Sequence, residues 1–163
     1  MFDPAAALEV LERHGVRYVV IGALAAAASG APVVTRDLDI APERTPRNLV
    51  RLAAALRELD ARLRTVADAT GVPFVIDEVT LAGADLWTLV TRAGELDLVF
   101  EPAGTRGFDD LRRDASRLDV GEGVSVLVAS LADVVRSKEA SARPKDLAQL
   151  PLLRQTLERR RLE

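Results

Sequence analysis

The sequence predicts an α+β fold in which strands and helices alternate along 163 residues. Residues 17–40 have the pattern of a strand, a tight turn, a helix and a second strand. Residues 86–100 contain two apolar runs separated by Ala93-Gly94, which is typical of a hairpin. After Thr45-Pro46, apolar residues recur at helical spacing. Because 48% of the residues are hydrophobic, the chain can bury an ordinary core, and we expect residues 1–163 to form a single domain.

The first quarter of the chain predicts two helices and two strands. Asp3-Pro4 is typical of a helix start, with Asp as N-cap, and Gly15 ends that helix. The β-branched and aromatic run 17–21 predicts a strand, which breaks at Gly22. We expect a short alanine-rich helix over 24–29 and a second strand over 37–40.

From residue 45 onwards the sequence again predicts both helices and strands. Thr45-Pro46 begins an amphipathic helix to about residue 59, and residues 65–71 predict a loop. The remaining expected elements are a helical turn at 77–81, strands at 86–92 and 95–100, a short helix at 107–113 and a strand pair at 118–120 and 124–128. A helical C-terminal segment follows from about residue 130, interrupted at Pro144, resuming at Lys145 or Asp146, and kinked or restarted at Pro151.

Two carboxylates in the second strand suggest a metal site. Side chains alternate faces in a strand, so Asp37 and Asp39 share one face while Leu38 and Ile40 face the core. Carboxylates held this close repel each other unless a cation or a proton neutralises part of the charge. A hard divalent cation such as Mg²⁺, or Mn²⁺ in its place, favours such an oxygen-rich environment.

Residues before this strand suggest an anion site beside the metal. Gly22 ends the first strand and precedes a helix, where the N–H groups of Gly22 and Ala23 can bind phosphate. Thr35 and Arg36 border the proposed site. Arg36 is either a phosphate contact or an ordinary surface arginine.

These motifs resemble the signature of the nucleotidyltransferase superfamily. Its members have a Gly-Gly or Gly-Ser turn before an acidic-x-acidic strand, and here Gly22-Ala23 is followed, after thirteen positions, by Asp37-Leu38-Asp39-Ile40. The third acid of the family lies on a neighbouring strand, where Asp97 is the matching candidate and Glu95 the alternative. The chain resembles in particular small bacterial members that include the AbiEii-type toxins, whose later basic-acidic segment is echoed by residues 138–146.

The resemblance implies a nucleotidyltransferase-like fold, with a mixed β-sheet and helices packed mainly on one face. It also implies metal-dependent transfer of a nucleoside monophosphate from a nucleoside triphosphate to an acceptor. The implied metal ligands and catalytic residues are Asp37, Asp39 and Asp97, and the implied nucleotide-binding residues are Gly22, Ala23, Thr35, Arg36 and Lys138. Ala23 departs from the family pattern, because the Ser of many members would add a hydroxyl contact to phosphate.

Three functions remain open from the sequence. The first is an active nucleotidyltransferase acting on RNA, tRNA ends or protein, as the toxin of a toxin–antitoxin pair with a cognate antitoxin. The second is a non-catalytic member that binds a nucleotide or a protein partner and regulates by association. The third is a small-molecule nucleotidyltransferase of the antibiotic-modifying kind.

The amino-acid composition limits the kinds of metal site, the location and the charged surfaces that we expect. The absence of cysteine excludes disulfides and thiolate metal sites, and the single histidine, His14, is expected to be a cap or surface residue. Without a long apolar run or a leader pattern, we expect a cytoplasmic protein with no membrane partner. Residues 136–163 carry eight Lys or Arg against four Asp or Glu, which suits either a solvated helix face or contact with phosphate.

Overall fold

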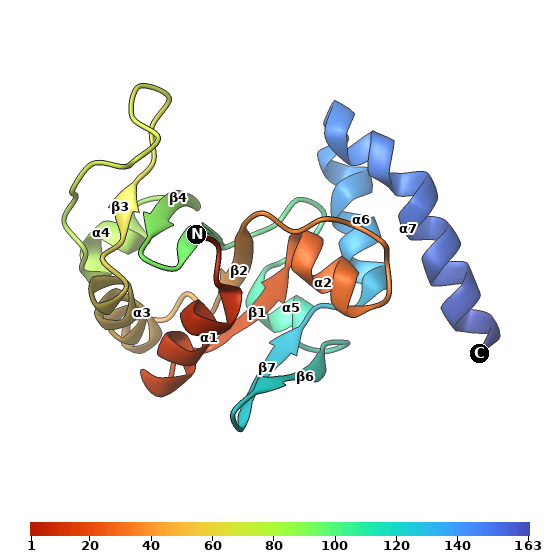
Figure 1. Cartoon of the computed structure of the whole chain (residues 1–163), viewed down its shortest axis with the longest axis horizontal. Helices are drawn as coiled ribbons and strands as arrows, with labels where there is room; N and C mark the ends of the chain where they lie inside the picture. Colours follow the sequence, from red (N-terminus) through yellow and green to blue (C-terminus); the bar gives the residue numbers. More distant parts are fainter.

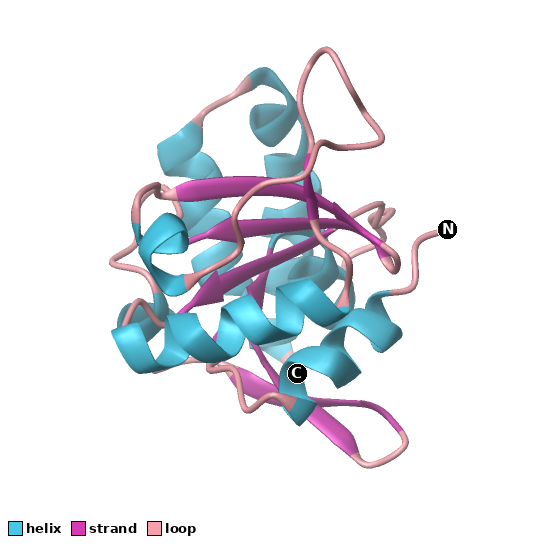
Figure 2. Ribbon diagram, turned by 90° about the vertical axis from the view of Figure 1, so that its left-hand side faces the viewer, coloured by secondary structure: helices cyan, strands magenta, loops and turns pink.

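The computed structural model describes residues 1–163 and contains seven strands in one mixed sheet. The strands are β1 (Tyr18–Ile21), β2 (Leu38–Pro42), β3 (Arg62–Leu63), β4 (Leu86–Thr91), β5 (Gly94–Val99), β6 (Ser116–Gly121) and β7 (Val124–Val128). Their order across the sheet is β3-β4-β5-β2-β1-β7-β6. Figure 2 shows this sheet with helices flanking it, which confirms the predicted combination of a mixed sheet and helices.

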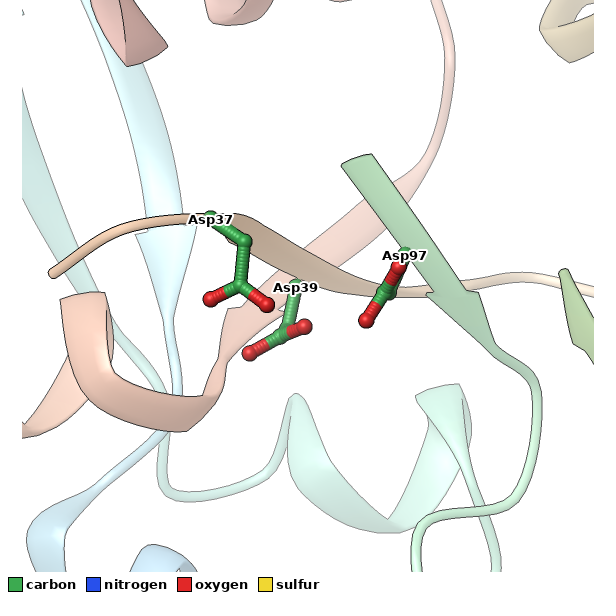
Figure 3. A group of neighbouring side chains, drawn as sticks. All are labelled: Asp37, Asp39 and Asp97. Carbon is green, nitrogen blue, oxygen red and sulfur yellow. The ribbon is translucent and has the colours of Figure 1, made fainter. Parts of the chain in front are cut away.

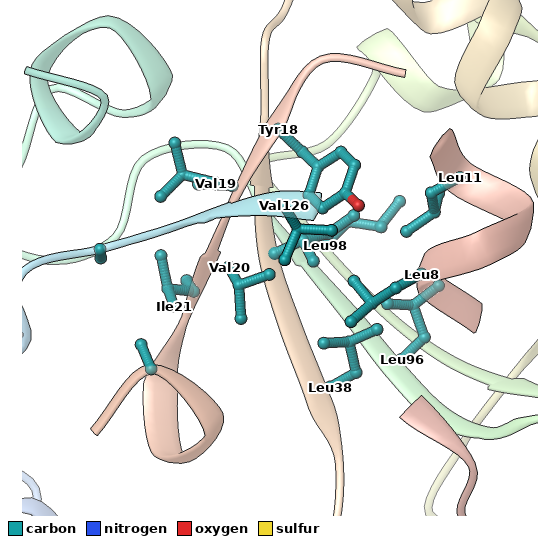
Figure 4. Packing of buried hydrophobic residues seen from close by; sticks show 14 of the residues in the cluster. Leu8, Leu11, Tyr18, Val19, Val20, Ile21, Leu38, Leu96, Leu98 and Val126 are labelled. Carbon is teal, nitrogen blue, oxygen red and sulfur yellow. The ribbon is translucent and has the colours of Figure 1, made fainter. Parts of the chain in front are cut away.

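The seven helices are α1 (Pro4–Arg13), α2 (Gly22–Ala28), α3 (Pro46–Glu58), α4 (Glu78–Ala82), α5 (Phe108–Leu111), α6 (Leu131–Ser141) and α7 (Pro144–Leu162). Helix α1 begins as predicted, because the Asp3 side chain accepts a hydrogen bond from the Ala6 N–H at 3.1 Å. Its apolar side chains Leu8 and Leu11 pack beside Leu38 of β2 and the leucines of β5 (Figure 4). None of the helices has both the length and the apolar character that crossing a bilayer requires.

Helices α6 and α7 form the right-hand side of the molecule in Figure 1. Helix α2 packs against α6, and α6 in turn packs against α7. The C-terminal helix is therefore connected to the sheet mainly through α6. This arrangement brings the first turn of α7 close to the α2 end of the sheet.

Several predicted boundaries differ from the observed ones. Helix α2 starts at Gly22, directly after β1 and two residues earlier than predicted. The two-residue strand β3 was missed because so short an edge strand has no detectable periodicity. Helix α7 begins at Pro144 and continues through Pro151 without restarting. Pro151 is exposed, while the buried residues Leu150 and Leu153 on either side of it hold the helix against the protein.

Candidate metal centre

Strand register brings three carboxylates together on neighbouring strands. Strand β2 lies between β1 and β5, and Asp39 is directly opposite Asp97 in the parallel β2–β5 pair. Asp37 comes immediately before β2. One carboxylate oxygen from each of the three residues lies within 4.8 Å of the others (Figure 3). The three side chains are half-buried, so the cluster is open on one side.

Gly22 lies very close to this cluster. It follows Ile21, which is opposite Asp39 in the antiparallel β1–β2 pair, and its φ is +68°. A Cβ atom at this position would collide with the Asp39 carboxylate. Only glycine combines this backbone conformation with so close an approach, and this accounts for the Gly at the strand-to-helix turn.

Crowding of the carboxylates changes their ionisation. Burial and then the charges of Asp37 and Asp97 raise the pKa of Asp39 to about 7. Burial and the charge of Asp37 also raise the pKa of Asp97, while Arg64 opposes this shift. A bound cation would offset the repulsion that raises both pKa values.

The oxygen atoms at the cluster suit a hard divalent cation. Oδ1 of Asp97 is buried and accepts no hydrogen bond within the protein. A buried acceptor without a donor costs free energy unless another group satisfies it. Three carboxylates with an unsatisfied oxygen among them match the all-oxygen coordination of Mg²⁺ or Mn²⁺, so the residues present fit such an ion.

The cluster opens into a cavity of about 780 Å³. Of the residues predicted to bind nucleotide, Gly22, Ala23, Arg36 and Lys138 line this cavity. Thr35 does not line it, although it is only two residues before Asp37. The volume lies within the roughly 300–1,000 Å³ typical of small-ligand sites.

Lys138 is held by an ion pair inside the cavity wall. Its Nζ lies 3.2 Å from Oδ1 of Asp146, whose residue exposure is only 1%. Oδ2 of Asp146 accepts hydrogen bonds from Ser141 Oγ and Arg143 Nε, both at 2.8 Å. Although burial alone would raise it, these hydrogen bonds lower the pKa of Asp146 to about 2. Asp146 therefore neutralises Lys138 and joins α6 to α7, and it does not cap the last helix.

Two cations beside the carboxylates were missed by the sequence analysis. Lys145 lines the cavity, is exposed, forms no ion pair, and lies close enough to lower the pKa of Asp39 by its charge. Arg64 has Nη2 at 4.0 Å from Oδ1 of Asp97 and Nη1 at 3.2 Å from Oε2 of Glu95. Glu95, the alternative third acid, thus pairs with Arg64 and lies outside the three-carboxylate cluster.

Comparison with known proteins supports the fold. No protein-family model and no curated protein matches the sequence. A crystal structure from Thermotoga maritima, described as that of "a putative nucleotidyltransferase (TM1012)", has the same architecture with a TM-score of 0.54 and 16% sequence identity. The alignment covers 98% of this chain and 96% of the other. The chain therefore has a nucleotidyltransferase-like fold.

Proposed function

We propose that the protein is a metal-dependent nucleotidyltransferase, which transfers a nucleoside monophosphate from a nucleoside triphosphate to an acceptor hydroxyl. One observation carries the proposal: Asp37, Asp39 and Asp97 converge beside Gly22 on a nucleotidyltransferase-like fold. Fold alone does not establish activity, because unrelated functions share folds. The unsatisfied oxygen of Asp97 and the cavity in front of it add local support.

The proposed reaction forms a bond between the acceptor oxygen and the α-phosphorus and breaks the bond from that phosphorus to the bridging oxygen of the β-phosphate. Pyrophosphate leaves with that oxygen. A divalent cation held by the three aspartates would stabilise the charge on the leaving oxygen and lower the pKa of the acceptor hydroxyl. A carboxylate of the cluster accepts the hydroxyl proton.

The other cavity residues would bind and orient the triphosphate. The backbone N–H groups of Gly22 and Ala23 bind its terminal phosphates, and Ala23 contributes no hydroxyl. Arg36 and Lys145 line the cavity and form no ion pair within the protein, so they can bind phosphate without losing a partner. Lys138 is already neutralised by Asp146 and contributes less net charge.

We propose RNA or protein as the acceptor, in a toxin that has a cognate antitoxin. The unpaired cations Arg36 and Lys145 at the cavity support an acidic or phosphate-bearing partner. A non-catalytic nucleotide-binding module is the second candidate. The missing hydroxyl at position 23 favours it, because triphosphate binding then depends on backbone donors and cations.

Isothermal titration of each nucleoside triphosphate, with and without Mg²⁺ or Mn²⁺, tests the proposal. We expect metal-dependent binding that is lost in the Asp37→Ala, Asp39→Ala double variant. The matched control is Asp114→Ala, Glu158→Ala, which removes two exposed carboxylates outside the cavity. Incubation with α-labelled triphosphates and candidate acceptors then separates the two functions. Label transfer with pyrophosphate release supports the enzyme, binding without release supports the module, and no binding to folded wild-type protein contradicts both.

A further inference from the structure

A second cavity lies at the opposite end of β1 from the carboxylates. Its volume is about 430 Å³, and it shares no lining residue with the first cavity. Tyr18 begins β1 and Gly22 follows its end, so the two sites are separated by about 13 Å at 3.3 Å per residue. We call it the arginine groove, and its lining residues are Glu12, Gly15, Val16, Arg17, Tyr18, Phe108, Arg112, Arg117 and Leu127.

Three arginines from separate parts of the chain converge on this groove. Arg17 precedes β1, Arg112 follows α5, and Arg117 lies in β6. The guanidinium carbons of Arg17 and Arg112 are 5.5 and 5.7 Å from the ring centroid of Phe108. Both guanidinium groups therefore lie within cation–π distance of the same buried ring. The groove thus has an apolar floor and a cationic rim.

The terminal nitrogens of these two arginines remain available. Arg17 is paired with Glu43 through Nε at 2.5 Å, and Arg112 with Asp109 through Nε at 3.5 Å. Asp109 is 79% exposed, so its pairing contributes little. No hydrogen bond within the protein engages the Nη atoms of Arg17 or Arg112. Each guanidinium therefore retains donors that an external acceptor can use.

The groove has little negative charge of its own. Glu12 is the only carboxylate that lines it, and that carboxylate accepts a hydrogen bond from the Tyr18 hydroxyl at 3.1 Å. Arg117 has no carboxylate partner, and its Nη1 lies 3.4 Å from the Ser125 carbonyl oxygen. The lining itself therefore holds three arginines and one carboxylate, and Arg17 and Arg112 share their charge with Glu43 and Asp109 outside it, whereas Arg117 has no carboxylate partner.

We propose that the arginine groove binds a phosphate group. Guanidinium groups bind phosphate in a bidentate manner, and the tetrahedral oxygens of a phosphate can accept from several directions at once. A phosphate group carries more negative charge and more acceptor oxygens than a carboxylate, so three arginines at one groove favour phosphate. The phosphate comes either from a small phosphorylated molecule or from the backbone of a nucleic acid. This inference does not depend on the function proposed for the carboxylate site.

Nuclear magnetic resonance titration of the full chain tests the groove. The titrants are inorganic phosphate, a nucleoside monophosphate, a single-stranded oligonucleotide and a poly-glutamate peptide, each followed through the ring signals of Tyr18 and Phe108. EDTA is included so that the carboxylate site holds no metal. The test variant is Arg112→Gln, Arg117→Gln, and the control is Arg47→Gln, Arg159→Gln, which removes two exposed arginines that have no bond within the protein. Both variants are checked for folding by circular dichroism.

We expect phosphate binding to weaken tenfold or more in the test variant and to stay unchanged in the control. If the oligonucleotide shows the same loss, the phosphate belongs to a nucleic acid, and if only the small anions do, it belongs to a small molecule. Equal phosphate binding by the test variant and the wild type would overturn the proposal. Preferential binding of poly-glutamate would also overturn it, in favour of an acidic protein partner.

Discussion

Replacing Gly22 with alanine should weaken metal binding strongly and destabilise the fold only modestly. Alanine at a φ of +68° costs about 1–2 kcal/mol, of which about 0.4–1 kcal/mol is regained through the lower entropy of the unfolded chain. The new Cβ must also displace the Asp39 carboxylate, and moving a side chain off its rotamer costs about 0.5–1.5 kcal/mol. We expect a loss of about 2 kcal/mol in the free energy of unfolding and at least tenfold weaker Mn²⁺ binding.

Gly123→Ala provides the matched control. Its φ is +76°, close to that of Gly22, and a Cβ there would meet no atom within 4 Å. Urea denaturation should show a loss on the order of 1 kcal/mol for this variant, and calorimetric titration should show unchanged Mn²⁺ affinity. Wild-type Mn²⁺ affinity in Gly22→Ala would refute the reasoning. Equal loss of affinity in both variants would show that backbone strain is responsible rather than the collision with Asp39.

Three further predictions follow from the charges. In metal-free protein the raised pKa of Asp39 favours the protonated folded state, so the free energy of unfolding should fall by about 2–3 kcal/mol between pH 5 and 8. Mg²⁺ or Asp39→Asn should remove this pH dependence. A flat pH profile in EDTA would contradict the prediction. Lys145→Ala should weaken triphosphate binding tenfold or more by titration calorimetry, whereas Arg154→Ala, elsewhere on α7, should not. Asp146→Ala should cost about 3–5 kcal/mol in urea denaturation, because it leaves the partly buried Lys138 and Ser141 without their carboxylate partner. A loss no larger than that of Asp109→Ala would argue against this role.

Two of the three carboxylates could be placed together by local rules, whereas Asp97 joins them through the nonlocal β2–β5 pairing and was proposed from the family resemblance. Alternation along one strand places Asp37 and Asp39 together, and the Gly22 turn is close to them in sequence. Lys145 and Arg64 reach the same cavity from α7 and from the segment after β3, and their positions depend on tertiary packing. No periodicity in the sequence carries that information.

The helix boundaries were predicted correctly where neighbouring residues determine them and wrongly where long-range packing does. Asp3 could be identified as a helix cap because the signal is contained in neighbouring residues. Pro151 was misleading for the opposite reason, since contacts of Leu150 and Leu153 with the rest of the protein outweigh the lost backbone hydrogen bond. The arginine groove is assembled from four separated segments and could not be foreseen.

The parallel pairing of β2 with β5 also affects the order in which the protein can assemble. A β1–β2 hairpin-like unit with Asp37 and Asp39 is complete once the first 42 residues are available, whereas Asp97 arrives only after α3, α4 and β4 have been made. During synthesis the growing chain therefore carries two of the three acids before the third is present. The full electrostatic cost of the cluster arises in the closing step, when β5 docks beside β2 and the nonlocal part of the sheet forms. A cation that binds the assembled cluster would offset this cost in the folded state.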